Sequence, residues 1–393
     1  MHACRVRRCA HLQIRVEQIK TLDFAALLSG QAAVNVSSVC QALSPHLDRP
    51  VEIDADEMQL LALVKPDTWS SCAGLVEVHG EACIEGLLAK QLLLAEGAAS
   101  PAVQRDRDFR GSHWHPDSAT LHAMSRWSHT DSIAAQRESR LQSVEDMVEA
   151  FGPPPPHFHR RADSQRRIAL DAPRRTELDD LLERRATCRN FDMTRSLSLA
   201  DLATLLKRVY GVQGLDELAP GAVALKKNHP SGGGLHPVEA YLIVQRVDGL
   251  ATGLYHYNVE VHALDLLREM PADQTRALAM VSVAGQEYFA DAPVMVVMAA
   301  RFARSMWKYR NHPKIYRAIL LEMGHISQNL YLTATEMNLG AFITAAINEV
   351  EIEQAFGLEP MAEGPLCVCG FGVRAKEKTT VEFDPAGKVW SDA

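Results

Sequence analysis

The sequence lacks any apolar run long enough to cross a membrane. Its longest candidates, Leu92–Leu94 and Ala292–Ala300, have the length of segments inside a protein core. The N-terminus is basic, but no apolar segment follows it, so we do not expect a secretory signal. A membrane partner is therefore not predicted.

The sequence also lacks paired cysteines and an excess of positive charge. Its 8 cysteines include no Cys-x-x-Cys pair and no zinc-type spacing, and scattered thiols are typical of the reducing cytoplasm. Lys and Arg number 41 against 49 Asp and Glu, so the net charge of −8 argues against a nucleic-acid partner. We therefore predict a cytoplasmic protein.

The composition itself is that of a globular protein, with 47% hydrophobic and 23% charged residues. The first part, to about Gly97, is predicted to be a compact module of short helices. Asp54–Glu57 supplies an acidic helix start, and a second helix begins at Glu81. It runs into Leu92–Gly97, which resembles the helix-to-wing transition of a winged-helix fold.

A winged-helix module can bind DNA or a peptide. The acidic segment Val51–Glu57 and the lack of a Lys/Arg-rich recognition helix weaken the DNA alternative. Peptide binding along a strand edge remains, because backbone hydrogen bonds give affinity that tolerates changes of sequence. Ser100–Ser112 is charged and without periodicity, so we expect a wing or loop there.

Four consecutive prolines, Pro153–Pro156, favour an extended conformation and predict a link between two parts of the chain. Residues 1–150 are predicted to form the winged-helix-like peptide-recognition module and a helical connector. Residues 151–167 are the predicted linker, and residues 168–393 the second domain.

From Ile168 onward the pattern alternates between helices and strands. It predicts three helices, over Thr176–Arg185, Leu199–Tyr210 and Lys314–Met337. In the first of them, the side chains expected to point inward are Leu178, Leu181 and Leu182. Strands are expected at Ala240–Gln245, Gly253–Tyr257, Val261–Leu264, Pro293–Ala300 and Leu366–Gly370. This order argues for an α+β fold in which helices layer a sheet.

Two arginines bracket a hydroxyl after the first of these helices. Arg185, Thr187 and Arg189 are spaced two apart, so an extended segment would aim all three toward one side. Guanidinium groups and a hydroxyl suit a phosphate dianion, and each charge-assisted bond contributes roughly 1.5–3 kcal/mol. A solvated basic turn remains the alternative for this segment alone.

Three consecutive glycines, Gly232, Gly233 and Gly234, lie within His229–Glu239. Glycines fenced by two prolines let the backbone approach a flat ligand more closely than any Cβ permits. The apolar run Tyr241–Val244 follows and predicts a buried strand. From this stretch alone, a cofactor loop and a mobile surface loop are both open.

Together these motifs resemble those of nitroreductase-like flavoproteins, and more narrowly the SagB-type dehydrogenases of peptide maturation. The shared order is Arg-x-Thr-x-Arg-x-Phe, then Pro-Ser-Gly-Gly-Gly-Leu-His-Pro-Val-Glu, then Gly253–Tyr257, then Glu322–Leu330 in the long helix. The resemblance covers roughly Ile168 to Val373. It implies a nitroreductase-like three-layer α/β/α domain that binds FMN and forms a homodimer, with each flavin near the subunit interface.

The resemblance implies a phosphate-binding role for several basic residues. Arg185, Thr187 and Arg189 fall where the family binds the phosphate and ribityl end of FMN. Arg374, after the last strand, is expected to add a phosphate contact. Ala186 replaces a second arginine that is usual in the family.

The resemblance also implies the residues around the flavin ring. Pro230, Ser231 and Gly232–Gly234 fall where the family's loop meets the ring. Gly340 and Ala341 match the stretch that covers its other side. Backbone donors near the ring's N5 and O4 would stabilise the reduced flavin.

The catalytic residues are expected at Lys308 and Tyr309. In the azoline-oxidising relatives that the sequence resembles, an adjacent Lys-Tyr pair at this position is implicated in catalysis. Removing a Cα proton from a thiazoline or oxazoline needs a base, and a lysine that loses solvation becomes a better one. A neighbouring tyrosine can relay the proton. The alternative is a charged helix entry in which Tyr309 packs.

No metal site is predicted. Glu322 and His325 form a Glu-x-x-His pair, but a di-iron bundle needs a second such pair and further carboxylates. His229 and His236 have no evident third ligand, and the polarity of the loop explains them better.

The expected function is FMN-dependent oxidation of azolines to azoles in a ribosomally made peptide. The N-terminal module would bind the leader of the peptide substrate, and partner cyclase or other maturation enzymes would cooperate. The alternatives are a reductase of dehydroamino acids, a reductase of small nitro or quinone compounds, and a non-catalytic peptide-presenting subunit. A small-molecule reductase has no need of an N-terminal extension of roughly 150 residues. The intact glycine loop, Arg185 and Arg189 speak against a non-catalytic subunit.

Overall fold

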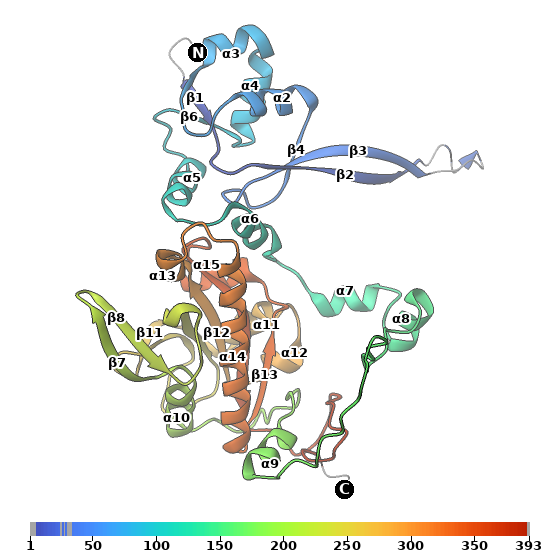
Figure 1. Ribbon diagram of the computed structural model, residues 1–393, viewed down its shortest axis with the longest axis vertical. Helices are drawn as coiled ribbons and strands as arrows, with labels where there is room; N and C mark the ends of the chain where they lie inside the picture. Colours follow the sequence, from blue (N-terminus) through green and yellow to red (C-terminus); the bar gives the residue numbers. More distant parts are fainter. Residues whose placement is uncertain (1–4, 24–25, 27, 30–33, 391–393) are drawn as a thin grey trace. The chain divides into compact units, whose positions relative to one another are not determined.

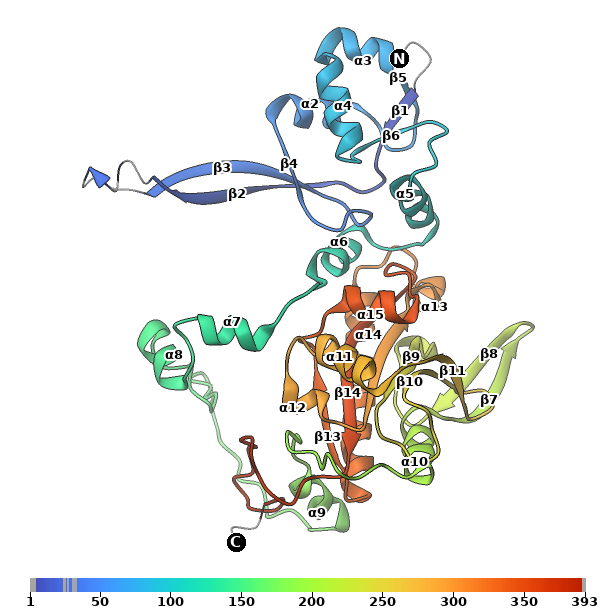
Figure 2. The ribbon, with the colours of Figure 1, turned by 180° about the vertical axis from the view of Figure 1, so that it is seen from behind.

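The structure is a computed structural model that describes residues 5–23, 26, 28–29 and 34–390. The chain divides into two compact units, whose elements Figures 1 and 2 show from opposite sides. The first unit consists of Met1–Arg126, Phe302–Arg317 and Pro360–Ala362. The second consists of Trp127–Arg301, Ala318–Glu359 and Glu363–Ala393. Two short segments of the C-terminal half therefore belong to the N-terminal unit.

The first unit contains a winged-helix-like part. Its three strands are antiparallel, with β1 (Arg5–Arg8) between β5 (Ser70–Ser71) and β6 (Leu93–Ala95). Its helices are α2 (Ala55–Leu63), α3 (Cys72–His79) and α4 (Glu81–Ala89). The predicted helix starts are confirmed: Asp54 and Glu57 form a capping box at α2, and α4 begins at Glu81. Leu60, Leu61, Ile84 and Leu87 are fully buried in the core of this part.

A long β-hairpin interrupts this part, and the sequence did not predict it. β2 (Gln13–Leu22) and β3 (Val34–Leu43) pair in antiparallel register from Gln13↔Leu43 to Leu22↔Val34. β4 (Val51–Ile53) pairs with β3 as the third strand. The expectation of short helices alone is therefore wrong for this region. Most residues of β2 and β3 are exposed on both faces, so no alternation of buried and exposed positions marks the strands.

The segment expected to be a wing or loop is a helix, α5 (Pro101–Gly111). Ser100 caps it by accepting from the backbone N–H of Val103, and Pro101 occupies the first turn, where its missing N–H costs nothing. The inward face carries Asp106, which is buried and bound by Arg110. Because a charged residue occupies the buried face, the sequence showed no continuous set of apolar residues at helical spacing. The next helix is α6 (Pro116–Ser125).

The second unit begins with two short helices and a long irregular stretch. α7 (Ser132–Glu138) and α8 (Val144–Phe151) precede residues 152–175, which contain neither helix nor strand. α9 (Glu177–Arg184) follows, with a capping box at Thr176. The prediction that Leu178 and Leu182 point inward is wrong, because their exposed fractions are 56% and 45%. Only Leu181 is half-buried, so α9 lies on the surface of its unit.

A six-stranded antiparallel sheet forms the centre of the second unit, in the order β11-β10-β9-β12-β14-β13. Its strands are β9 (Val238–Val244), β10 (Gly253–Asn258), β11 (Ala263–Glu269), β12 (Val294–Arg301), β13 (Gly340–Thr344) and β14 (Glu363–Gly372). β9, β10, β12 and β14 were predicted from the sequence; the strand expected at Val261–Leu264 overlaps β11 at only Ala263 and Leu264, and β13 was not predicted. The hairpin of β7 (Val212–Ala219) and β8 (Ala222–Lys227) was not predicted and pairs separately.

Helices cover both faces of this sheet, which gives the predicted three layers. α14 (Lys314–Glu336) crosses one face, whereas α11 (Ala272–Ser282) and α12 (Glu287–Ala290) lie on the opposite face (Figures 1 and 2). α10 (Leu199–Tyr210) and α15 (Glu349–Phe356) also belong to this unit, whereas α13 (Phe302–Lys308) belongs to the first unit. α10 and α14 match their predicted ranges to within one residue.

Among the described residues, no helix combines the length and the apolar character that a membrane crossing requires. The seven cysteines in the described part of the chain are free thiols.

Candidate functional site

The glycine loop joins β8 to β9 in a conformation that needs glycine. Gly233 and Gly234 have φ values of +70° and +69°, in the left-handed region that other residues rarely adopt. Both glycines are exposed, and a Cβ on Gly234 would meet no atom within 4 Å. The backbone of this loop is therefore open to a flat ligand.

Hydrogen bonds and close packing hold the glycine loop against α14. Ser231 Oγ donates to Glu322 Oε2 at 2.5 Å and accepts from the backbone N–H of His236 at 2.9 Å. The N–H of Gly234 donates to the Ser231 carbonyl at 3.0 Å. A Cβ on Gly232 would lie 3.3 Å from the Cβ of Ala318, so loop and helix are in close contact. These contacts fix the conformation of the loop, and the alternative of a mobile surface loop is not supported.

Two histidines that flank the glycine loop lie next to a glutamate of α14. His229 Nε2 and His236 Nδ1 lie 3.5 and 3.6 Å from Glu322 Oε1, and the two nitrogens are 3.3 Å apart. All three side chains are buried. Burial by itself would raise the pKa of Glu322, but the nearby imidazoles of His229 and His236 and the hydrogen bond from Ser231 outweigh it and lower the pKa to about 2. The carboxylate is therefore ionised at neutral pH.

The first two residues of the predicted phosphate-binding set come together at Tyr331 of α14. The Arg185 guanidinium lies 5.4 Å from the centre of the Tyr331 ring, and Thr187 Oγ1 is 3.0 Å from the Tyr331 hydroxyl. That hydroxyl also accepts from the backbone N–H of Ile343 at 3.2 Å. Burial raises the pKa of Tyr331, so its hydroxyl keeps its proton and can donate it to Thr187.

The other two basic residues meet at a second point, around Glu382. The Arg189 backbone N–H donates to Glu382 Oε1 at 2.5 Å, and Arg374 forms an ion pair with the same carboxylate. Trp390 Nε1 donates to it at 2.8 Å. Burial alone would raise the pKa of Glu382, but these hydrogen bonds and charges lower it. Arg189 and Arg374 thus share an internal carboxylate, apart from the pair at Tyr331.

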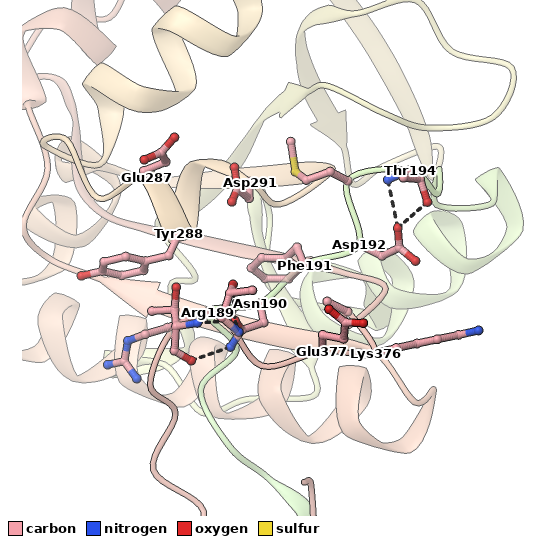
Figure 3. Close-up of a pocket in the computed structure, with 14 residues that line it drawn as sticks. Arg189, Asn190, Phe191, Asp192, Thr194, Glu287, Tyr288, Asp291, Lys376 and Glu377 are labelled. Carbon is pink, nitrogen blue, oxygen red and sulfur yellow. Dashed lines mark hydrogen bonds between the residues drawn. The ribbon is translucent and has the colours of Figure 1, made fainter. Parts of the chain in front are cut away.

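A pocket of about 750 Å³ opens beside Arg189 (Figure 3). It is lined by charges of both signs, including Asp291 and Lys376, and by the ring of Tyr288. The Arg189 guanidinium lies 5.8 Å from the centre of that ring. The pocket therefore offers a mixed polar surface rather than a collected positive charge.

Gly340 and Ala341 lie in β13, next to the predicted phosphate-binding segment. Thr187 pairs with Ala341 as a parallel bridge, and the Cys188 N–H donates to the Ala341 carbonyl at 2.8 Å. A Cβ on Gly340 would meet Cys188 Sγ at 2.4 Å, so only glycine allows this close approach. In the structure, both residues hold the Arg185–Arg189 segment against the sheet.

Lys308 and Tyr309 belong to the first unit, at the end of α13. Lys308 is exposed, and its Nζ lies 5.6 Å from the centre of the half-buried Tyr309 ring. They are thus adjacent to each other, while the other predicted site residues lie in the second unit. Their catalytic role stays a prediction.

Comparison with known proteins identifies this architecture. A model of the nitroreductase family matches residues 182–373. Protein MJ1384 of Methanocaldococcus jannaschii, which is named as a nitroreductase, is 30% identical over 196 residues, covering 50% of this chain and 90% of that protein. The chain belongs to the nitroreductase family. It therefore has the fold of a family of oxidoreductases, many of which bind flavin.

Two further relatives are named for peptide processing. The trifolitoxin-processing protein TfxB of Rhizobium leguminosarum bv. trifolii is 34% identical over 144 residues, which are 36% of this chain and 38% of that protein. The microcin B17-processing protein McbC of Escherichia coli is 27% identical over 196 residues, covering 47% of this chain and 65% of that protein. The matches thus span about two fifths and two thirds of these relatives. They fit the SagB-type resemblance.

Sequence reasoning missed three residues that organise this site. The sequence grouped Glu322 with His325 and with the long-helix signature, whereas in the structure Glu322 is buried and binds Ser231 of the glycine loop. His325 is exposed, and its Nδ1 lies 3.4 Å from the Pro230 carbonyl. Tyr331 was not singled out at all, although it follows the predicted helix signature by one residue. Glu382 lies in a C-terminal segment that carries no periodic pattern.

Proposed function

We propose that this nitroreductase-family protein is an FMN-dependent dehydrogenase that modifies residues of a ribosomally made peptide. The similarity to two peptide-processing proteins supports this proposal most strongly. The reaction is the oxidation of an azoline to an azole.

The residues of the second unit suit FMN. The Tyr331 hydroxyl accepts from the Ile343 N–H and lies 3.0 Å from Thr187 Oγ1; when Tyr331 donates across this contact, the Thr187 hydroxyl proton is left to donate to a phosphate oxygen. The Arg185 guanidinium adds a charge-assisted donor beside it. The exposed backbone of Gly233 and Gly234 would face the flavin ring, with Pro230 and Ser231 at the loop's start. Gly340, Ala341, Arg189 and Arg374 complete the proposed cofactor-binding set.

The chemistry needs a base and a two-electron acceptor. Bound FMN would supply the acceptor for the hydride. Lys308 would take the proton from the Cα of the azoline ring while a hydride leaves the neighbouring ring carbon, so that a double bond forms between these two carbons and the ring becomes aromatic. Tyr309, next to Lys308, passes that proton to solvent.

The first unit would recognise the peptide leader. Its β2 is an edge strand over Gln13–Leu22, and several of its apolar side chains are exposed, including Val16 and Leu22. An extended peptide could pair with this edge through backbone hydrogen bonds. A homodimer with FMN near the interface, and partner cyclase or maturation enzymes, belong to the same proposal.

Removal of one phosphate donor tests the cofactor part. Arg185→Ala should weaken FMN binding roughly 10- to 100-fold, because a charge-assisted hydrogen bond contributes about 1.5–3 kcal/mol. Titration of the flavin-free chain with FMN, followed by flavin fluorescence, measures the effect. Arg184→Ala is the matched control, since Arg184 is the exposed neighbour in sequence. Equal FMN affinity in all three proteins would remove Arg185 from the site.

Replacement of the proposed base tests the chemistry. Lys308→Ala should retain FMN and lose most azoline oxidation, roughly 100-fold or more, as expected for loss of a general base. The exposed Lys314 provides the control variant Lys314→Ala, which removes the same charge nearby. Turnover is followed by the mass of the peptide, which falls by the mass of two hydrogen atoms. Unchanged turnover in Lys308→Ala would contradict the assignment.

A further inference from the structure

The buried cluster of His229, His236 and Glu322 is not used by the proposed flavin chemistry. Its three facing atoms are His229 Nε2, His236 Nδ1 and Glu322 Oε1, with separations of 3.3, 3.5 and 3.6 Å. A circle through three points at these separations has a radius of about 2 Å, which is the length of a bond from zinc to imidazole nitrogen or carboxylate oxygen. The three atoms thus surround a point at metal-bonding distance.

The orientation of the two rings fits the same point. Two imidazoles that share one tetrahedral ion at about 2 Å have ring centroids about 5.2 Å apart. A straight N–H···N hydrogen bond of the observed length would place the centroids about 5.6 Å apart. The observed separation between the His229 and His236 rings is 5.1 Å, with the ring planes at 80°. The observed separation therefore matches that of two imidazoles bound to one ion.

Hydrogen bonds alone leave this cluster poorly satisfied. The contacts of 3.5 and 3.6 Å to Glu322 Oε1 exceed the usual 2.7–3.2 Å of a protein hydrogen bond. Glu322 Oε1 and His229 Nδ1 are both buried, and neither has a hydrogen-bond partner among the described residues; the exposed fraction of Glu322 is 2%. An unpartnered buried carboxylate oxygen is costly, and an ion at the shared point would satisfy it.

The backbone is held in a rare conformation to form the cluster. His236 has a φ of +47°, in the left-handed region where a residue with a Cβ is uncommon. Such a conformation costs of order 1 kcal/mol and persists where the surroundings impose it. Here it turns the His236 ring toward Glu322. Ser231 Oγ meanwhile binds the other carboxylate oxygen, so Glu322 presents only Oε1 to the point between the rings.

We propose that His229 Nε2, His236 Nδ1 and Glu322 Oε1 bind one divalent first-row transition-metal ion. Two imidazoles and one carboxylate are a donor set that suits zinc or iron(II). The ion would tie the glycine loop to α14, because His229 and His236 flank the loop and Glu322 lies on the helix. The binding site thus has a structural role beside the flavin site and does not depend on the proposed redox reaction.

Metal analysis of the full-length chain tests the proposal. Protein purified without chelator, and protein reloaded with zinc, iron(II) or cobalt(II) after chelation, is passed over a desalting column, and its metal content is measured by plasma mass spectrometry. We expect about one ion per chain, and cobalt(II) should give the visible absorption of a tetrahedral or five-coordinate site. The metal retained by untreated protein distinguishes zinc from iron.

Two variants and a matched control locate the ion. His229→Gln and Glu322→Gln should lower the bound metal at least tenfold and abolish the cobalt(II) absorption. His325→Ala should change neither, because His325 is an exposed metal-capable residue on the same helix outside the cluster. Retention of metal in both cluster variants would place the ion elsewhere and overturn the proposal. So would wild-type protein that binds none of the three ions.

A measurement on unmutated protein covers the case in which a variant fails to fold. Chelation should lower the thermal transition of the second unit, and the reloaded ion should restore it, because a ligand of the native state stabilises it by mass action. This readout does not involve flavin, so failure here leaves the proposed function untouched. A transition that is unchanged by chelation and by reloading would contradict a bound structural ion.

Discussion

Each unit of the molecule buries histidine, and the two environments differ in a way that separates packing from function. In the first unit, His122 lies among Trp114, Phe302 and Tyr316. Its Nε2 is 2.9 Å from the Pro360 carbonyl, and its Nδ1 is 3.2 Å from the Tyr316 hydroxyl. A carbonyl only accepts, so Nε2 carries the proton and Nδ1 accepts from Tyr316. Both ring nitrogens are satisfied.

In the second unit, His229 and His236 face a carboxylate and each other instead. In the described part of the chain, Glu322 Oε1 and His229 Nδ1 have no hydrogen-bond partner. Burial lowers the pKa of His122 to about 4, opposed in part by its hydrogen bond to Pro360. His122, a neutral ring with both nitrogens hydrogen-bonded, is a core residue. His229 and His236, which both face an oxygen of the ionised Glu322, form a candidate binding site. The following predictions test this contrast.

The largest effect is expected from removal of the shared carboxylate. Glu322→Ala leaves two buried histidines and Ser231 without their partner, and loss of one member of a buried charged cluster typically costs about 3–5 kcal/mol. Urea unfolding measures the loss, and peptide-resolved hydrogen exchange should locate it at the glycine loop and α14. His325→Ala on the same helix should cost about 0.5 kcal/mol or less. A cost below about 1 kcal/mol in Glu322→Ala would show that the cluster does not hold the loop.

A second effect, of about 3 kcal/mol, is expected from acid acting on His122. The native pKa is lowered from the ordinary 6.5 to about 4, so the unfolded state binds the proton first as the pH falls. The stability associated with the neutral ring is fully present above pH 6.5 and is lost between 6.5 and 4. The Trp114 and His122 ring centroids are 5.6 Å apart, so tryptophan fluorescence can follow the first unit once Trp127 and Trp390 of the second unit are replaced by Phe.

The matched variant for this titration is His122→Phe, which keeps an aromatic ring and cannot be protonated. Between pH 6.5 and 4, the unfolding free energy of this variant should fall by about 3 kcal/mol less than that of the wild type. Equal slopes in the two proteins would mean that His122 is hydrated or charged in the native state.

The smallest effects are expected from removal of one hydroxyl in each histidine environment, that of Ser231 in the second unit and that of Tyr316 in the first. Ser231→Ala removes a donor to an ionised carboxylate and the acceptor of the His236 N–H, and should cost about 2 kcal/mol. Tyr316→Phe removes a single bond to a neutral imidazole and should cost about 1 kcal/mol. Urea midpoints of the two proteins give the comparison. A larger cost for Tyr316→Phe would reverse the ranking of the two environments.

Much of the second unit could be predicted from the sequence, because its elements bury one regular face. α14 showed its period of three to four residues, and β9, β10, β12 and β14 showed apolar runs. The arms of the β2–β3 hairpin are exposed on both faces and showed no pattern. In α5, the charged Asp106 occupies a buried position, so the apolar residues did not recur at helical spacing and the sequence predicted a loop.

The site was predictable where its residues are close in sequence and not where the fold joins them. The glycine loop and the Arg185–Arg189 segment are local motifs. Glu322 is separated from Ser231 by 91 positions, so no spacing rule could identify it as the third partner of His229 and His236. Local spacing paired it with His325, because residues three apart share a helix face. Packing decides otherwise, with Glu322 buried and His325 exposed.

The central claim is that this chain binds FMN and removes hydrogen from a peptide. Purified protein is to be examined by visible absorption, the extracted flavin identified by mass, and the peptide substrate weighed before and after treatment. We expect a yellow protein with about one FMN per chain and a peptide lighter by the mass of two hydrogen atoms for each azoline oxidised. A colourless protein that FMN neither binds nor stabilises against heat would contradict the account.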